Sequence, residues 1–425
     1  MGVAKKKQTI SYRERKNYAQ FFTEASLVKE IQNTFSLVFD NKSIVEPSCG
    51  EGVFIYELLK NNVVEIVGVD IDKKVLKKIN KNNKLKLLND DFLTASFSKK
   101  YDMVIGNPPF NLKAKNYNDS TEGFISKGID ILNEGGELIL ILPSTVLRNK
   151  CYQRIRHKIL TQTRIIGILN TTKYEFLGAD IETIALYLKK EIVSEQKYTY
   201  YNDNKSEKIT LSINSRETIL LNNTKVFKDV VSKIIGVKLI EIFEVKRGLN
   251  QIGLQGRMLD FYNDKHVMET KKQHCFIGIQ NIAYRFTANA IIGDPKVVRD
   301  TITMLMPKKR IDIDKLRFIA SFLNSSVAFY ILHNNCLNNC RLTIHMDKYY
   351  IEDIVIPMPT SNDIKKIDVE LFNSKQSLDY AAKRNVFFYN YLGLTEKEIS
   401  EIEKIWSNPK FKYKEEVSSY ESLQK

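Results

Sequence analysis

The first half of this 425-residue sequence predicts an α/β fold built on a mostly parallel sheet. Two observations support this prediction. Short apolar, strand-like segments alternate with segments of helical spacing, and the recognisable turns follow the ends of those strands. We expect strands near residues 43–46, 66–69, 85–88, 102–105, 138–142, 165–169 and 183–188. Such a sheet is typically covered by helices on both faces and binds ligands at the carboxyl ends of its strands.

A second domain is expected because 425 residues exceed what one ordinary core accommodates. The stretch from 189 to 225 is polar and is interrupted only by short β-like pieces such as 209–211. We therefore place the boundary near residue 225, which gives domains of residues 1–225 and 226–425. With 43% hydrophobic and 27% charged residues, the chain can fill two cores and is not a disordered sequence.

Asn107-Pro108-Pro109-Phe110 is the most informative motif, and it follows the apolar strand expected at 101–106. An adenine N6 amine is a poor nucleophile, so a catalyst must hold both of its hydrogens. The Asn107 side-chain oxygen can accept one, and the carbonyl of Pro108, whose φ is fixed, can accept the other. Phe110 offers a flat surface for the ring. The alternative is a plain turn that closes a strand, which Asn-Pro also favours.

A second motif spans residues 45–54 and joins an expected strand to a helix. Gly50 and Gly52 lie in its turn, where a backbone can approach a ligand closely. The next expected strand ends in Asp70, and an acid at this place in a nucleotide-binding fold can accept hydrogen bonds from ribose hydroxyls. These residues predict a nucleotide-like ligand at the edge of the sheet.

Together the motifs resemble the gamma group of S-adenosylmethionine-dependent DNA adenine-N6 methyltransferases, which belong to type II restriction-modification systems. The resemblance covers most of the first 190 residues. It implies a Rossmann-like class I methyltransferase domain with a mostly parallel seven-stranded sheet, and S-adenosyl-L-methionine as cofactor. It implies a catalytic set of Asn107, Pro108, Pro109, Phe110 and, as a second ring against an extruded base, Phe176. The implied cofactor-binding set is Gln20, Phe22, Thr23, Glu46, Pro47, Cys49, Gly50, Gly52, Asp70, Ile71, Asp91, Phe92 and Asn107. Structural alternatives are core packing for Phe22 and Phe92, a loop anchor for Phe176, and helix capping for Asp70 and Asp91.

The second half resembles the target-recognition domains of the same group, which implies a mixed α+β domain that binds double-stranded DNA. A net charge of +15 favours an acidic polymer as partner, and residues 226–350 hold 19 Lys and Arg against 11 Asp and Glu. The side chains that we expect to contact DNA are Arg247, Asn250, Gln251, Gln255, Arg257 and Arg341. We also expect one helix over 316–333 and a capping box at Thr395-Glu398.

The five cysteines show no zinc or disulfide spacing, so we expect a reduced, cytoplasmic protein without a structural metal. No apolar run is long enough to cross a bilayer. We expect a monomer whose cognate restriction endonuclease, where one exists, acts separately.

Four activities are consistent with these motifs. Site-specific adenine-N6 methylation of DNA is favoured, because cytosine-N4 methyltransferases usually carry Ser in place of Asn107. Ribosomal RNA and release-factor methyltransferases share Asn-Pro-Pro with an aromatic but typically lack a long second domain. A binding-only specificity module would need a decayed cofactor loop, yet Gly50, Gly52 and Asp70 are all present.

Overall fold

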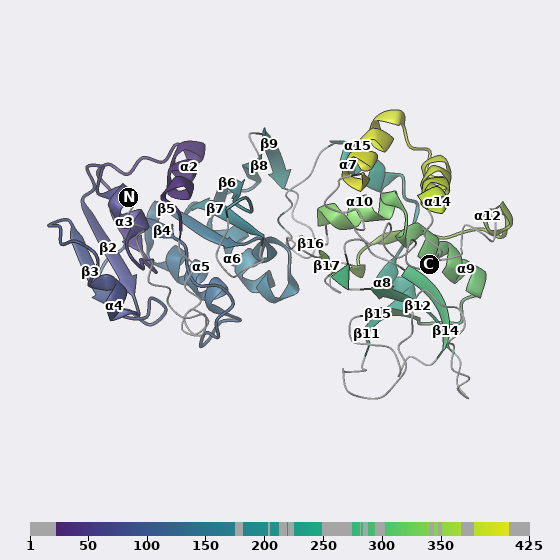
Figure 1. Cartoon of the computed structure of the whole chain (residues 1–425), viewed down its shortest axis with the longest axis horizontal. Helices are drawn as coiled ribbons and strands as arrows, with labels where there is room; N and C mark the ends of the chain where they lie inside the picture. The colour runs from purple at the N-terminus through teal and green to yellow at the C-terminus, as the bar shows by residue number, and fades with distance from the viewer. Residues whose placement is uncertain are drawn as a thin grey trace, which may run out of the picture. The chain divides into compact units, whose positions relative to one another are not determined.

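The computed structural model describes residues 23–174, 182–202, 205–211, 219, 225–248, 274–280, 282–283, 288–293, 302–335, 337–339, 344–346, 351–366 and 378–407. The chain divides into two compact units, Met1–Leu221 and Asn222–Lys425 (Figure 1). We describe each by itself. Eight residues with predicted roles lie outside the described residues: Gln20, Phe22, Phe176, Asn250, Gln251, Gln255, Arg257 and Arg341.

The first unit is built on one sheet, with strands in the order β3-β2-β1-β4-β5-β7-β6-β8-β9. Their bounds are β1 Ser43–Glu46, β2 Glu65–Asp70, β3 Leu85–Asn89, β4 Tyr101–Gly106, β5 Leu132–Pro143, β6 Arg164–Asn170, β7 Thr183–Lys189, β8 Gln196–Asn202 and β9 Lys205–Leu211. The seven expected strands and the α/β class are confirmed. The expected total of seven was wrong, because among the described residues β8 pairs in parallel with β6, and β9 pairs with β8.

Parallel pairing brings the predicted motifs to one edge of this sheet. Strands β3, β2, β1, β4 and β5 are parallel, and β7 is antiparallel to both β5 and β6. The register pairs Val45 of β1 with Val67 of β2 and with Val104 of β4. The carboxyl ends of β1, β2 and β4 therefore lie side by side, and the loops that follow them can share one site.

Helices cover both faces of the sheet, since successive residues of a buried strand point to opposite sides. In β5, Leu138, Leu140 and Leu142 share a buried cluster with residues of α5 (Ser120–Asp130) and α6 (Gln153–Gln162). Ile139 and Ile141 share another with residues of α2 (Ala25–Phe35), α3 (Val53–Leu58) and α4 (Lys73–Leu76). Two short 3-10 helices, Ser144–Leu147 and Lys150–Tyr152, follow β5. This two-sided packing makes the sheet a rigid base for the loops at its edge.

The second unit has the expected mixed α+β composition, and its described sheets are antiparallel. Its strands are β10 Gly236–Lys238, β11 Phe243–Arg247, β12 His274–Gln280, β13 Ile282–Ala283, β14 Ala288–Gly293, β15 Ile302–Pro307, β16 Leu337–Asn339, β17 Ile344–Met346 and β18 Val355–Pro357. Its helices are α7 Lys225–Ser232, α8 Leu239–Ile242, α9 Ile313–Leu323, α10 Ser326–Asn335, α12 Ser361–Lys366, α14 Leu378–Tyr391 and α15 Glu396–Trp406. Most of these elements contribute residues to one buried hydrophobic cluster.

The single helix expected over 316–333 was wrong, because the chain bends by 60° between α9 and α10. The Asn324 side chain donates to the Ala288 carbonyl and accepts from the Ala288 N–H, both at 2.7 Å, which ties the break to β14. Ser325 Oγ accepts from Ala328 N and so caps the second helix. The capping box at the start of α15 is confirmed, with Thr395 and Glu398 bonded reciprocally.

No single helix among the described residues is long and apolar enough to span a membrane. The bent pair of α9 and α10 meets the length and composition requirement only when the two are taken together. Their apolar residues lie in the hydrophobic cluster of the second unit.

Candidate active site

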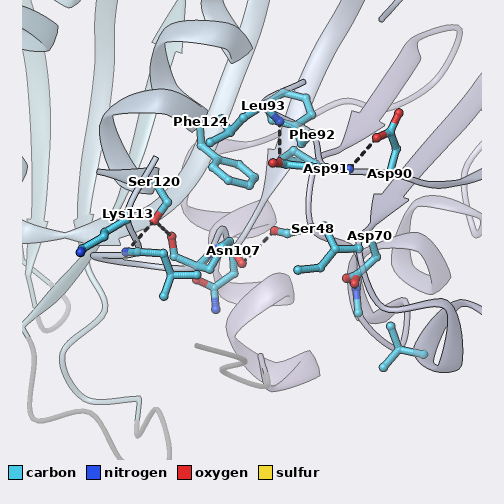
Figure 2. Close-up of a pocket in the computed structure, with 16 residues that line it drawn as sticks. Ser48, Asp70, Asp90, Asp91, Phe92, Leu93, Asn107, Lys113, Ser120 and Phe124 are labelled. Atoms are coloured by element: carbon cyan, nitrogen blue, oxygen red, sulfur yellow. Dashed lines mark hydrogen bonds between the residues drawn. The ribbon is translucent and has the colours of Figure 1, made fainter. Parts of the chain in front are cut away.

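A cavity of about 290 Å³ opens at the carboxyl edge of the first unit's sheet, near the lower end of the usual size for ligand pockets. It is lined by the turns after β1, β2, β3 and β4 and by the start of α5. The lining residues are Pro47, Ser48, Gly50, Asp70, Ile71, Val75, Asp90, Asp91, Phe92, Leu93, Asn107, Pro109, Leu112, Lys113, Ser120 and Phe124. In Figure 2 the acids Asp70, Asp90 and Asp91 lie on one side, and Asn107, Ser120 and Lys113 on the other.

The turn after β1 brings backbone to the cavity at Gly50. Gly50 and Gly52 have φ of +50° and +84°, in the left-handed region that glycine adopts without strain. Gly52 is also the N-cap residue of α3, and Cys49, which precedes Gly50, is buried. A Cβ on Gly52 would lie 3.3 Å from Ile79, whereas one on Gly50 would meet no protein atom within 4 Å. A ligand can therefore approach Gly50 closely, and the two glycines have different roles.

Asp70 is held in place by the same turn. Its carboxylate accepts from Gly50 N and from Asp72 N, both at 2.8 Å. Burial raises the pKa of Asp70, although these two hydrogen bonds oppose the shift. Helix capping does not explain Asp70, because Asp72 caps α4 by accepting from Lys74 N. Each carboxylate oxygen keeps a lone pair for a ligand hydroxyl.

The turn after β3 contributes an acid and an aromatic side chain. Asp91 is exposed and accepts from Leu93 N at 2.9 Å, so it braces its own turn while lining the cavity. Phe92 is only 1% exposed, and its ring stacks on that of Phe124 with centroids 5.1 Å apart. Lys127 Nζ lies 5.3 Å from the centroid of Phe92. Phe92 therefore packs in the core and also lines the cavity, so the two interpretations of this residue are not alternatives.

Glu46 ends β1 beneath the cavity and is 2% exposed. Its Oε2 atom has no hydrogen-bond partner in the described part of the chain. Burial, and next the nearby charge of Asp70, raise the pKa of Glu46 well above its ordinary value. A buried acceptor without a donor costs free energy unless a ligand supplies one.

Asn107, at the end of β4, has a side chain that is held at one end only. Its Nδ2 donates to Thr23 Oγ1 at 3.1 Å, whereas its buried Oδ1 accepts no hydrogen bond from any described residue. Asn107 is also one of the residues that line the cavity.

The carbonyls of the Asn-Pro-Pro turn are used unequally. Those of Asn107 and Pro109 accept from Ser48 Oγ at 3.1 Å and from Ser120 Oγ at 2.7 Å. The carbonyl of Pro108 receives no hydrogen bond from the residues that the structure describes. Phe110 is 3% exposed and packs in a hydrophobic cluster, outside the residues that line the cavity.

Of the predicted site residues, the structure places Pro47, Gly50, Asp70, Ile71, Asp91, Phe92, Asn107 and Pro109 around the cavity. Thr23, Glu46, Cys49, Gly52, Pro108 and Phe110 lie adjacent in sequence or in contact with them but do not line it. The sequence analysis missed Ser48, Val75, Asp90, Leu93, Leu112, Lys113, Ser120 and Phe124. Ser48 and Asp90 adjoin predicted residues, whereas Ser120 and Phe124 come from α5 and have no local signal.

Arg247 is the one predicted DNA contact among the described residues, and it is exposed at the end of β11. The described residues contain no group of three or more His, Cys, Asp or Glu side chains that could hold a metal ion.

The fold and the cavity together define an α/β protein with a ligand-sized cavity at the carboxyl edge of a mostly parallel sheet. Residues 55–176 match the family model described as Eco57I restriction-modification methylase. The type II methyltransferase M.CvrRI of Paramecium bursaria Chlorella virus XZ-6E is 25% identical over 206 residues, which cover 45% of this chain and 54% of that protein. The type II methyltransferase M.HincII of Haemophilus influenzae is 30% identical over 159 residues, covering 32% of this chain and 30% of that protein.

The matched part of the chain is thus similar to type II restriction-modification methyltransferases. The chain spans about half the length of the viral relative and less than a third of the bacterial one. Among solved structures, a class I S-adenosylmethionine-dependent methyltransferase from Listeria monocytogenes aligns at 20% identity with a TM-score of 0.34, over 42% of this chain and 64% of that one.

Proposed function

We propose that this protein transfers a methyl group from S-adenosylmethionine to N6 of an adenine that is turned out of double-stranded DNA. The modified site would be protected from a cognate restriction endonuclease that acts separately. The relatives named above are type II methyltransferases by name. The family model matches residues 55–176, which include most of the residues that line the cavity.

One observation carries the proposal: two consecutive residues that follow β4 each hold an acceptor without a donor from any described residue. These are the buried Oδ1 of Asn107 and the carbonyl oxygen of Pro108, neither of which is bonded to any described residue. An exocyclic amine has two N–H donors. Gripping both orients the nitrogen and localises its lone pair toward an electrophile, and alignment of this kind accounts for much of an enzymatic rate enhancement.

The other side of the cavity fits S-adenosylmethionine, which supplies an activated methyl group when it is bound. Asp70 can accept from ribose hydroxyls, Phe92 and Ile71 can flank an adenine ring, and the backbone at Gly50 leaves room for close approach. Glu46 Oε2, buried and without a partner among the described residues, can accept from the cationic methionine part. No metal is needed for this assignment of roles.

The target base would be enclosed by aromatic surface, which offsets the few kcal/mol that unstacking and unpairing cost. We assign this role to Phe110 and Phe176, as the resemblance implies. Because Phe110 is packed among apolar residues here, its contact with a base requires the turn to open toward the substrate.

The second unit would bind the duplex. Its net positive charge between 226 and 350, together with the exposed Arg247, supports a phosphate-contacting surface. We propose that the protein acts as a cytoplasmic monomer.

The base and the polymer are tested together. Purified protein is incubated with labelled S-adenosylmethionine and with duplex DNA, single-stranded DNA or ribosomal RNA, and the products are digested to nucleosides. We expect N6-methyladenine from duplex DNA. N4-methylcytosine, or label found only in RNA, would contradict the proposal. Long-read sequencing of DNA from cells that express the protein would then name the recognition site.

A further inference from the structure

The two prolines that follow Asn107 cannot brace the turn with backbone N–H groups. Pro108 and Pro109 have no N–H, so neither can donate a hydrogen bond that fixes the turn. Their rings fix φ, but the direction of each carbonyl depends on ψ, which the ring leaves free. The direction of the Pro108 carbonyl, and so its hydrogen bond to a substrate, therefore depends on donors from elsewhere in the chain that hold the turn.

Ser120, the first residue of α5, supplies most of that support (Figure 2). Its Oγ donates to the Pro109 carbonyl at 2.7 Å and accepts from Leu112 N at 3.1 Å. Its own N–H donates to the Leu112 carbonyl at 2.7 Å. One residue thus closes the chain from 109 to 112 with three hydrogen bonds, and it is only 3% exposed.

The start of α5 is itself fixed, so these bonds have a rigid origin. Asp119 caps the helix by accepting from Glu122 N at 3.1 Å, and its other oxygen accepts from Tyr152 OH at 2.5 Å. Burial of Asp119 and Glu122, at 9% and 2% exposed, keeps water from competing for these contacts. A displacement of Ser120 is therefore resisted by the 3-10 helix Lys150–Tyr152 as well as by α5.

We propose that Ser120 is a positioning residue for methyl transfer. It engages the Pro109 carbonyl and so fixes ψ of Pro109. Of the three successive carbonyls from Asn107 to Pro109, only that of Pro108 then stays available to the substrate amine. Ser48, which engages the Asn107 carbonyl, is its counterpart on the preceding residue. This inference rests on the proposed function.

The test compares Ser120→Ala with Ser126→Ala, a serine of the same helix whose Oγ accepts from Lys158 and does not contact the turn. Single-turnover methyl-transfer rates are measured with saturating cofactor and duplex, and Kd is measured for each by titration. We expect Ser120→Ala to slow transfer about tenfold, because small misplacements of reacting groups are costly. Both Kd values should stay within twofold of wild type, and Ser126→Ala should be unchanged.

The hydroxyl itself is tested by replacement. Ser120→Thr should recover most of the rate. Ser120→Cys keeps the side-chain volume with a weaker donor, so its rate should fall between those of wild type and Ser120→Ala. The cysteine variant also serves as the test if the alanine variant fails to fold. Wild-type rates in Ser120→Cys and Ser120→Ala would overturn the inference, as would a rise in cofactor Kd equal to the loss of rate. An inactive wild-type protein would instead refute the proposed function.

Discussion

The two units encode their proposed tasks in different ways. In the first, Glu46, Asp70 and Asn107 directly end or follow parallel strands, so the strand register that pairs Val45 with Val67 and Val104 also sets their spacing. In the second, the expected DNA contacts come from a stretch of basic and amide residues without a strand-end motif, and only Arg247 lies among the described residues.

This difference implies that chemistry and recognition can be separated by mutation. Substitutions at the sheet edge of the first unit should change the rate or the cofactor affinity and leave duplex affinity alone. Substitutions in the second unit should do the reverse. A first-unit variant that changes duplex affinity, or a second-unit variant that changes the rate or the cofactor affinity, would show that the comparison is wrong.

The largest effect is expected for Asn107→Ala, which removes the side-chain acceptor at the end of β4. Transfer should slow by about 10²–10³-fold, the usual loss when one preorganised contact to the reacting group is removed. Cofactor affinity should be retained. Single-turnover kinetics and calorimetric titration measure the two quantities, with Asn118→Ala, an exposed residue of the following loop, as control. Near-normal turnover would contradict the assigned chemistry.

Asp70→Ala should act on the cofactor rather than on the chemical step. Losing charged hydrogen bonds to ribose hydroxyls costs about 1.5–3 kcal/mol, which corresponds to a cofactor Kd raised about 10–100-fold. Asp72→Asn is the matched control, because Asp72 caps α4 two residues away and does not line the cavity. Equal cofactor Kd values in the two variants would remove Asp70 from the binding site.

Glu46 predicts a dependence of stability on pH in the cofactor-free protein. Burial and the charge of Asp70 raise the pKa of Glu46, so the folded state keeps its proton to higher pH than the unfolded state does. Stability of the first unit should therefore fall as pH rises above about 4.5, the ordinary value for this side chain. Denaturant unfolding of wild type and Glu46→Gln between pH 5 and pH 8 measures the effect.

The glutamine variant should lose this contribution and gain stability at neutral pH, while binding the cofactor more weakly. Asp102 gives the opposite sign. Burial works against ionisation of Asp102, yet hydrogen bonds from Ser43 N, Ser43 Oγ and Asn133 lower its pKa, so its contribution is lost as pH falls. A pH profile that Glu46→Gln leaves unchanged would mean that Glu46 is ionised and paired in the folded state.

Much of the first unit was predictable because its signals are local. Seven strands, the left-handed glycines of the β1 turn and the acid at the end of β2 each follow from a few adjacent residues and from the geometry of parallel sheets. The two added strands were not predicted as part of the sheet, because neither has a long apolar run. β8 is fixed by parallel pairing with β6, and β9 by antiparallel pairing with β8.

The parts of the site that were missed depend on distant contacts. Ser120 reaches Pro109 across 11 positions of sequence, and Phe124 becomes cavity wall only because α5 packs against the turn after β3. The bend between α9 and α10 has the same cause, since the Asn324 side chain is fixed by Ala288, 36 positions away. Hydrophobic periodicity continues through that bend, so periodicity alone could not place it.

The smallest effect is expected for Arg247→Ala, and it tests the recognition side of the comparison. Removing one phosphate contact should weaken duplex binding about threefold to tenfold and lower the slope of log Kd against log salt by about one. Arg317→Ala is the control, because Arg317 is an exposed arginine of the same unit that is already paired with Asp314 at 3.0 Å.

Equilibrium binding to a duplex is measured at several salt concentrations, along with single-turnover rates at saturating duplex. Because saturating duplex compensates for weaker binding, the rate should match wild type if Arg247 only holds phosphate. A lowered rate at saturation would mean that this arginine takes part in presenting the base, and the two units would then share the chemistry. An unchanged slope together with an unchanged Kd would place the phosphate contacts elsewhere in the second unit.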